Sequence, residues 1–276
     1  MKTLNLHPLF EVHWRKTEWP VIKEAIKAQV HNPLADHLLL TEMEVCFVGE
    51  LSTGAGTEER HQILEKSPGW IGISHQVGDR LKEMKMKGLI AHHLANCLGV
   101  ITLTTYAAEE WQKTFPGVRT ATIRHPLGHR TTQFELSDTY DYRIRSLGKW
   151  KRKYDIWERL DSPYQKLPGS HELHYPAKAF DALFRDTIQF MDLEDASANN
   201  GVLECIRRNV PLLIRRHPAV VEYLGADYPF YFRNGREANE KINQPELIAE
   251  THAYLLEMDK TYLEIGLLCR EIHRAT

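Results

Sequence analysis

One run of the sequence constrains the fold more than any other part, residues 187–232, TIQFMDLEDASANNGVLECIRRNVPLLIRRHPAVVEYLGADYPFYF. It opens with a short apolar segment, residues 187–191, that has the character of a strand. A cluster of small and polar residues, 196–201, follows and leads into residues 202–206, whose apolar spacing is helical. Ser and Asn stand where N-cap residues are found. The run therefore predicts a strand that passes into a helix through small residues.

A second strand and helix follow directly in the same run. Residues 211–214, PLLI, predict a buried strand. Residues 218–225 predict a helix with Pro at an early position and Gly at its end, which is the usual asymmetry of helix termini. Strands that alternate with helices in this way are typical of α/β proteins with a parallel sheet.

The start of the first of these helices suits a phosphate group. Several backbone N–H groups lack partners at a helix N-terminus, the helix dipole is positive there, and small side chains let an anion come close. The residues at this turn are Ser197, Ala198, Asn199, Asn200 and Gly201. A simple capped helix end has the same composition, so this pattern alone leaves both interpretations open.

The whole run resembles the donor domain of GT-B glycosyltransferases of the group 1 type, which use a nucleotide sugar. In that family a small-residue turn, a helix carrying Leu-Glu, a strand with Pro and a later Pro-x-x-x-Glu helix enclose the donor. The matching residues are 197–200, 203–204, 210–212 and 218–222. The resemblance implies that Glu204 binds the ribose and that residues 197–200 line the diphosphate or the sugar. A carboxylate suits the ribose because it accepts from two adjacent hydroxyls.

The sequence departs from the family pattern at one acidic position. Retaining members often carry a second Glu eight positions before the ribose Glu, and Ala196 stands there in this chain. Glu194 and Asp195 lie nearby but out of register. The acid that contacts the sugar therefore stays unassigned.

The first half of the chain also predicts strands that alternate with helices. Residues 70–75, 99–103 and 121–123 have the character of buried strands, and helices are expected near residues 89–96 and from Thr104 onward. This half resembles the acceptor side of GT-B enzymes, with an I-x-H-N motif, a helix that follows a later strand, and a His-Pro pair. The matching residues are 73–76, 101–106 and 125–126, with Gln76 in place of the usual Asn.

His75 is the candidate catalytic residue. It follows a predicted strand, and ligands of open α/β sheets bind at the carboxyl ends of strands. It would be a general base or a contact to the sugar. A histidine whose hydrogen bonds are satisfied at the end of a strand is the structural alternative.

A basic cluster follows the predicted strand at residues 143–148. We expect Gly148, Lys151, Arg152 and Lys153 to bind the donor diphosphate, because Arg forms bidentate bonds and Lys supplies a mobile point charge. Runs of charge are otherwise typical of solvated faces. The position after a strand that ends in glycine, together with the family resemblance, favours the phosphate interpretation.

The expected fold is therefore α/β, of the GT-B type, with two Rossmann-like domains facing a cleft. We expect an acceptor-side domain over residues 1–137, reduced in size because about 130 residues form only a small sheet of this kind. Residues 138–276 would form the nucleotide-sugar donor domain. Its C-terminal helix, within residues 245–273, would return to the first domain as in other GT-B enzymes.

Composition limits the other function classes. With 35 basic and 37 acidic residues the net charge is −2, which gives no global basic excess of the kind that indicates nucleic-acid binding. The four cysteines form no C-x-x-C pair, and no apolar stretch is long enough to span a membrane, so we expect a cytoplasmic protein. Neither a zinc-binding spacing nor a D-x-D motif occurs, and no metal is expected in the site.

The sequence thus predicts a glycosyltransferase of the hexosyltransferase class that moves a sugar from a UDP- or GDP-sugar to an acceptor hydroxyl on a glycan or small molecule. Two alternatives stay open beside it. A non-catalytic relative would bind a nucleotide sugar or a partner protein without turnover. A sugar-nucleotide epimerase shares the architecture, but no acid pair supports it.

A third alternative is a glycosyltransferase that acts on hydroxymethylated bases in DNA. It would need a surface of cations that follows the DNA phosphates, and its affinity for DNA would fall steeply as the salt concentration rises. The candidate residues are Arg80, Lys82, Lys85, Lys87, Arg207, Arg208, Arg215 and Arg216.

Overall fold

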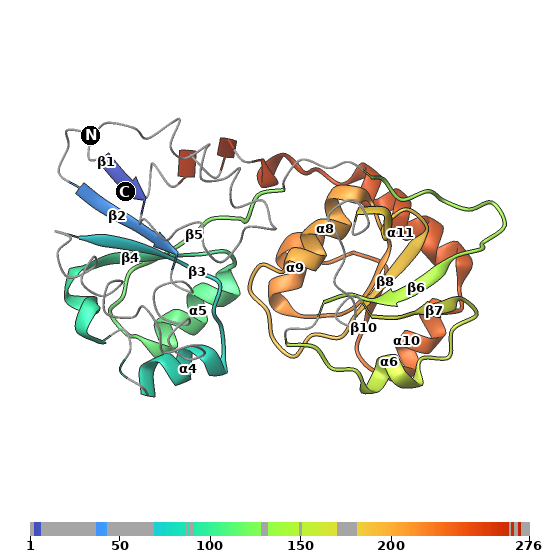
Figure 1. Cartoon of the computed structure of the whole chain (residues 1–276), viewed down its shortest axis with the longest axis horizontal. Coiled ribbons are helices and arrows are strands. Elements are labelled where there is room, and N and C mark those ends of the chain that lie inside the picture. Colours follow the sequence, from blue (N-terminus) through green and yellow to red (C-terminus); the bar gives the residue numbers. More distant parts are fainter. Residues whose placement is uncertain are drawn as a thin grey trace. The chain divides into compact units, whose positions relative to one another are not determined.

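The computed structural model describes residues 3–6, 37–42, 69–86, 88, 91–127, 132–148, 151–169, 181–264, 266–267 and 270–271. The chain divides into two compact units, Met1–Gly128 with Thr261–Thr276, and His129–Lys260 (Figure 1). Each unit holds one parallel sheet. In the sequence, residues 18–30 have the apolar spacing of an amphipathic helix and residues 45–48 have the character of a strand, and both segments lie outside the described residues.

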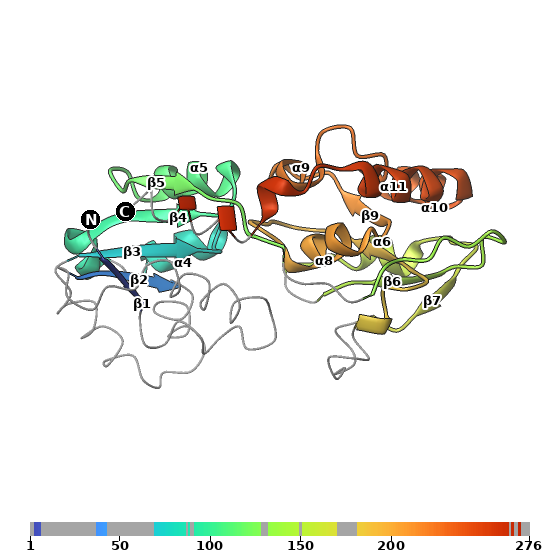
Figure 2. The ribbon, with the colours of Figure 1, turned by 90° about the horizontal axis from the view of Figure 1, so that it is seen from above.

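The first unit is built on a sheet in which neighbouring strands follow the order of the sequence. All its strand pairs are parallel, and Figure 2 shows β2 to β5 in their order across the sheet. The strands are β1 (Thr3–Leu6), β2 (His37–Glu42), β3 (Trp70–Ser74), β4 (Cys97–Thr102) and β5 (Thr120–Thr122). The expected reduced sheet has five strands in the described part of the chain, the same number as the second sheet.

Short helices follow these strands and close the core of the first unit. They are α4 (Asp79–Met86), a 3-10 helix (Ala91–Asn96) and α5 (Thr105–Thr114). Helix α5 begins where the sequence predicts, because the Thr104 hydroxyl accepts from Ala107 N at 3.1 Å. On its inner face Trp111 is fully buried and donates from Nε1 to Ser74 Oγ at 2.9 Å. This bond fixes α5 to the end of β3.

The second unit contains a sheet with a reversal in strand order. Its strands are β6 (Arg143–Ser146), β7 (Gln165–Leu167), β8 (Thr187–Met191), β9 (Leu212–Arg215) and β10 (Tyr231–Phe232), in the spatial order β10-β9-β8-β6-β7 and all parallel. The chain leaves β6 toward β7 and later returns to the other side of β6 as β8. The switch point of the sheet therefore lies between β6 and β8, where open α/β sheets bind their ligands.

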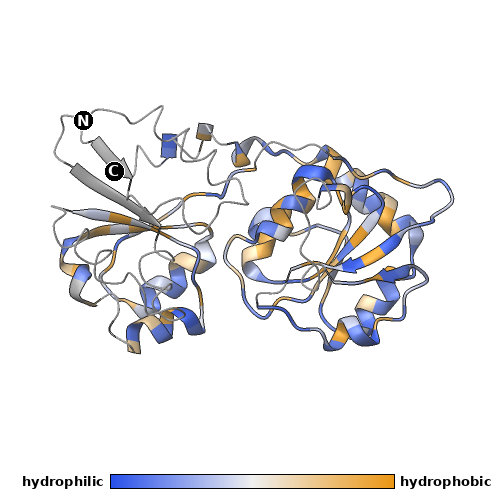
Figure 3. Cartoon of the chain, in the orientation of Figure 1, coloured by the Kyte–Doolittle hydropathy of each residue, from blue (hydrophilic) through white to orange (hydrophobic). Residues whose placement is uncertain are grey.

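Helices and buried aromatic side chains complete the second unit. The helices are α6 (Asp155–Arg159), α8 (Asn200–Arg208), α9 (Pro218–Leu224), α10 (Gly235–Ile242) and α11 (Pro245–Glu257). Phe184, Phe190, Phe230 and Phe232 are fully buried, and the rings of Phe190 and Phe232 stack with centroids 5.5 Å apart. Figure 3 shows hydrophobic residues on the central strands and hydrophilic ones on the outer faces of the helices.

The units divide after Gly128, whereas we expected a boundary after residue 137. The sequence placed a C-terminal helix within residues 245–273. Helix α11 ends at Glu257 with Met258 as its C-cap, and a 3-10 helix follows at Thr261–Leu263. Helix α11 belongs to the second unit, and Thr261–Thr276 belongs to the first. There Leu127 N donates to Leu263 O at 2.7 Å.

Candidate functional site

The turn between β8 and α8 packs closely onto the ends of two strands. Asn199 is the N-cap of α8, and its Oδ1 accepts from Gly201 N at 3.0 Å. A Cβ atom at Gly201 would lie 2.6 Å from Met191 Cε and 3.0 Å from Leu147 Cδ2. Only glycine fits this position without rearrangement. The glycine thus lets the start of α8 approach the ends of β6 and β8.

The segment after β6 pairs with the segment after β8. Lys153 N donates to the Asp192 carbonyl at 2.9 Å, and Glu194 N donates to the Lys151 carbonyl at 3.0 Å. Between them Arg152 forms an antiparallel bridge with Leu193. The basic segment and the small-residue turn, which the sequence predicted to line one site, are therefore brought together at the switch point of the sheet.

Two neutral oxygens orient Arg152 over this turn. Its Nε donates to the Leu147 carbonyl at 3.1 Å, and its Nη2 donates to Asn199 Oδ1 at 3.2 Å. Gly148, with a φ of 81°, leaves room for the guanidinium, since a Cβ there would lie 3.0 Å from Nη2. Burial lowers the pKa of Arg152 to about 10, partly offset by Tyr154, so the group stays charged at neutral pH. A desolvated cation in this position favours an anionic ligand.

Ser197 adds a buried hydroxyl to the same turn. The residue is 5% exposed, and its Oγ has no hydrogen-bond partner among the described residues. Buried polar groups are nearly always paired, so a hydroxyl of this kind indicates a place for a ligand atom or a water molecule. Its neighbours Ala198 and Asn200 are partly exposed on the same turn.

The other two cations of the basic segment are less constrained than Arg152. Lys153 is exposed and Lys151 is half-buried with a φ of 54°. Within the part of the chain that the structure describes, neither ammonium group makes a hydrogen bond or an ion pair. Their role as phosphate ligands stays a prediction.

Glu204 lies on the second turn of α8 and binds two arginines of the same helix. Its Oε2 accepts from Arg207 Nη2 at 2.8 Å and from Arg208 Nη1. The Arg208 side chain is 3% exposed and also binds Asp181, with 3.1 Å between Nε and Oδ1. The sequence predicted only a ribose ligand here. The structure adds an ion-pair role, and the remaining lone pairs of the carboxylate can still accept from hydroxyls.

An ion pair that the sequence analysis missed lies at the next strand ends. The Asp192 side chain is fully buried after β8, and both its oxygens accept from Arg215 at the end of β9, with 3.0 Å between Nη2 and Oδ2. Arg215 Nη1 also donates to the Arg233 carbonyl after β10 at 2.6 Å. This pairing raises the pKa of Arg215. Parallel strands align their carboxyl ends. An Asp after one strand and an Arg at the end of the next could therefore have predicted this ion pair from the sequence.

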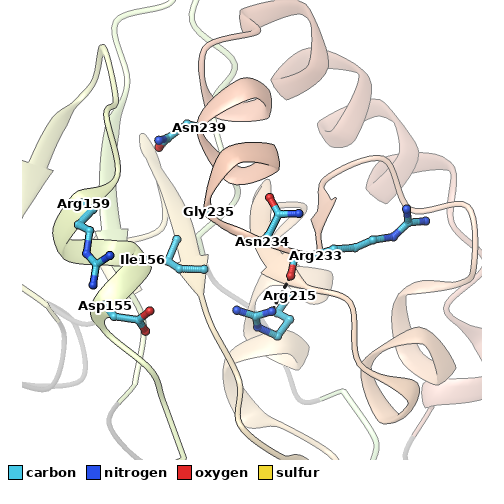
Figure 4. Close-up of a pocket in the computed structure, with 8 residues that line it drawn as sticks. All are labelled: Asp155, Ile156, Arg159, Arg215, Arg233, Asn234, Gly235 and Asn239. Atoms are coloured by element: carbon cyan, nitrogen blue, oxygen red, sulfur yellow. Dashed lines mark hydrogen bonds between the residues drawn. The ribbon is translucent and has the colours of Figure 1, made fainter.

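A pocket of about 390 Å³ lies beside this ion pair, between α6 and the start of α10 (Figure 4). In Figure 4 the side chain of Arg233 points away from Asp155 and Arg159, while its carbonyl accepts from Arg215. The pocket contains none of the residues that the sequence singled out for the donor. The lining residues are Asp155, Ile156, Arg159, Arg215, Arg233, Asn234, Gly235 and Asn239.

His75 lies in the first unit, directly after β3, and is half-buried. Its backbone is fixed by its neighbours, because Ser74 Oγ accepts from Trp111 Nε1 at 2.9 Å and from Gln76 N at 3.2 Å. Its ring centroid lies 6.3 Å from that of His125, with the planes at 69°. The remaining predicted site residues belong to the second unit.

The described residues contain no group of three or more side chains that could hold a metal ion. A search of the same residues finds no helix long and apolar enough to cross a membrane.

No family model matches the sequence, and no curated protein matches it significantly in sequence. Solved structures match nearly the whole chain. Sucrose-phosphate synthase from Thermosynechococcus elongatus has a TM-score of 0.62 at 11% identity, over 97% of this chain and 78% of that one. WaaG, a glycosyltransferase involved in lipopolysaccharide biosynthesis, has a TM-score of 0.60 at 11% identity, over 100% of this chain and 98% of that one.

A third similar structure is Anabaena Alr3699/HepE in complex with UDP and glucose, with a TM-score of 0.58 at 9% identity, over 97% of this chain and 82% of that one. At such identities the likeness establishes the fold. The chain has the GT-B fold, which confirms the fold class predicted from the sequence.

Proposed function

We propose that this protein is a glycosyltransferase that moves a sugar from a nucleotide-sugar donor to an acceptor hydroxyl. The observation that carries the proposal is the partly buried guanidinium of Arg152, which binds the N-cap residue Asn199 of α8 on the same turn as the buried Ser197 hydroxyl, at the switch point between β6 and β8. A cation, a helix N-terminus and a buried hydroxyl in one place suit a diphosphate.

The proposed chemistry follows from these groups. When the sugar leaves the donor, negative charge builds on the departing diphosphate. Arg152 and the N–H groups at the start of α8 would stabilise that charge. Because Leu147 and Asn199 already orient the guanidinium, little reorganisation is needed during the reaction. Lys151 and Lys153 would add further positive charge, so the site has no requirement for a divalent metal.

The donor we propose is a UDP- or GDP-sugar. UDP is the first choice because the similar HepE structure contains UDP and glucose. Glu204 would accept from the ribose hydroxyls, and residues 197–201 would line the diphosphate and the sugar. The second unit is thus the proposed donor domain. We propose a hexose as the transferred sugar, because the similar HepE structure contains glucose.

We assign the acceptor side to the first unit. His75, at the carboxyl end of β3, would act as general base or contact the transferred sugar. A glycan or a small molecule with a hydroxyl group would be the acceptor.

The arrangement of cations argues against a DNA acceptor. Arg207 and Arg208 are paired with Glu204, and Arg215 is paired with Asp192, so these three are engaged within the protein. Arg80 and Lys82 also pair with acidic neighbours on α4, which leaves only Lys85 and Arg216 without an acidic partner among the described candidates. Lys87 lies outside the described residues. A surface that follows phosphates would need cations that are not already neutralised.

Binding and donor hydrolysis test the proposal. UDP, GDP, ADP, CMP and their common sugars would be screened by thermal shift, and any hit would be measured by calorimetry and assayed for hydrolysis. The expected result is binding with slow hydrolysis that depends on Arg152. Arg159→Ala is the matched control for Arg152→Ala, because Arg159 is exposed on α6 and makes no hydrogen bond or ion pair with another described residue.

The outcomes separate the candidate functions. A nucleotide sugar that binds and is hydrolysed, with both properties reduced in Arg152→Ala only, supports a transferase and identifies its donor. Binding without hydrolysis or transfer to any acceptor supports the non-catalytic alternative. The absence of binding by every nucleotide overturns the proposal.

A further inference from the structure

Two histidines lie near the same edge of the first sheet. His75 follows β3 and His125 follows β5, with β4 between these strands. Parallel strands place their carboxyl ends at one edge, which brings the two rings to a centroid distance of 6.3 Å in an edge-on arrangement. In the sequence, His125 stands out only as part of a His-Pro pair.

The ring of His125 is fixed in one orientation and one tautomer. The residue is 2% exposed, and its Nδ1 lies 2.9 Å from the carbonyl oxygen of Pro126. A carbonyl oxygen only accepts, so Nδ1 carries the proton and Nε2 holds the lone pair. Burial also lowers the pKa of His125 to about 4, which keeps the ring neutral at physiological pH.

We infer that His125 is a positioning residue, which holds the ring of His75 in the orientation needed for sugar transfer. This inference rests on the proposed function, in which His75 acts as general base or contacts the transferred sugar. The backbone of His75 is fixed by the bonds of Ser74 to Trp111 and Gln76. The terminal torsion of a histidine side chain is soft, so the groups packed against the imidazole set the angle of the ring, and His125 is one of these groups. The edge-on ring of His125 limits rotation about that torsion.

Two variants separate the ring contact from the backbone bond. His125→Asn keeps an N–H donor for the Pro126 carbonyl but removes the ring that meets His75. His125→Phe keeps a ring of similar size but removes the bond to Pro126. His252→Phe is the matched control, because His252 is half-buried in the second unit, its Nδ1 lies 2.7 Å from the Asn209 carbonyl, and its ring packs on Phe134.

The measurements are the imidazole ¹⁵N signals of His75 by NMR and the kinetics of transfer. We expect His125→Asn to shift the His75 signals and to lower kcat about tenfold, with the KM for the donor unchanged, because small misplacements of reacting groups slow chemistry more than binding. His125→Phe and His252→Phe should stay within about threefold of the wild type. In a His75→Ala background, His125→Asn should cause no further loss of kcat.

The two proposals fail in different ways. If no nucleotide binds the wild type, the proposed function fails, and the His75 signals still decide whether His125 orients that ring. If the wild type transfers sugar while His125→Asn leaves kcat and the His75 signals unchanged, the inference is overturned and the proposed function stands. If the loss of activity in His125→Asn and His125→Phe is proportional to the fraction of unfolded protein, measured by thermal unfolding, the inference is also overturned.

Discussion

Arg152 and Asn199 are joined by a hydrogen bond of 3.2 Å between Nη2 and Oδ1, and the same oxygen accepts from Gly201 N as the N-cap of α8. One amide therefore both starts the helix and orients the cation. The position of the positive charge depends directly on where α8 begins. A substitution of Asn199 can therefore change the charge of the site while the stability of the fold stays nearly the same.

Asn199→Asp should preserve the fold and weaken binding of a diphosphate. Asp caps helices as well as Asn and can accept from both Gly201 and Arg152, so the free energy of unfolding should change by less than about 1 kcal/mol. The new negative charge would neutralise Arg152, and the affinity for UDP should fall more than about tenfold. Uridine, which has no phosphate, is the control ligand. Equal affinity of the variant and the wild type for UDP would contradict the assigned role.

Gly201→Ala should destabilise the second unit. The added methyl group would lie 2.6 Å from Met191 Cε and 3.0 Å from Leu147 Cδ2, which are both ends of side chains that can shift, so we expect a cost of about 1 kcal/mol, at the low end for overpacking. Gly235→Ala is the control, because a Cβ at Gly235 would meet Ile156 at an ordinary 3.7 Å. Urea denaturation measures both. Equal midpoints for the two variants would show that the turn can adjust without cost.

The first unit should lose stability as the pH falls from about 6.5 to about 4. Burial lowers the pKa of His125 from 6.5 to about 4, so in this range the unfolded chain takes up a proton that the folded chain does not. The loss should approach about 3 kcal/mol near pH 4, at 1.36 kcal/mol for each pKa unit. Urea denaturation at a series of pH values measures it, with His125→Phe as the reference. A parallel decline in the two proteins would rule out this residue as the cause.

Glu204→Gln should weaken nucleotide binding through the ribose. We expect a loss of about 1–3 kcal/mol in UDP affinity, and no loss for an analogue of UDP that lacks both ribose hydroxyls. The change also removes the charge that pairs with Arg207 and Arg208, so stability must be measured beside affinity. Asp181→Asn is the matched control, because it removes the other carboxylate of Arg208. If the analogue and UDP lose affinity equally, Glu204 acts only through the fold.

The strands and helices with strong local patterns were predictable. Residues 187–191 form β8 as expected, because a short run of five residues that are all buried, between polar segments, is typical of a strand inside a sheet. Helix α8 begins at Asn200 and α9 ends before Gly225, where cap residues mark the termini. By contrast, β7 and β10 have three and two residues, which is too few to show the alternation of apolar and polar side chains that predicts a strand. These short strands form because neighbouring strands offer backbone partners.

The site was predictable in its location more than in its interactions. The basic segment and the small-residue turn meet as expected, since both follow strands that border the switch point. The sequence did not distinguish Arg152 from Lys151 and Lys153, because the side chain that turns inward is decided by the pairing with residues 192–194. The contact between His75 and His125 depends on strand order, which local patterns do not contain.

The first unit is discontinuous along the chain, since Thr261–Thr276 belongs to it together with Met1–Gly128. During synthesis the ribosome must therefore make all of His129–Lys260 before Leu263 can accept the bond from Leu127. Domains generally fold as units while the chain emerges, so the second unit can close its sheet while the first still lacks its last segment. The half of the molecule that is translated first is thus the half that is completed last.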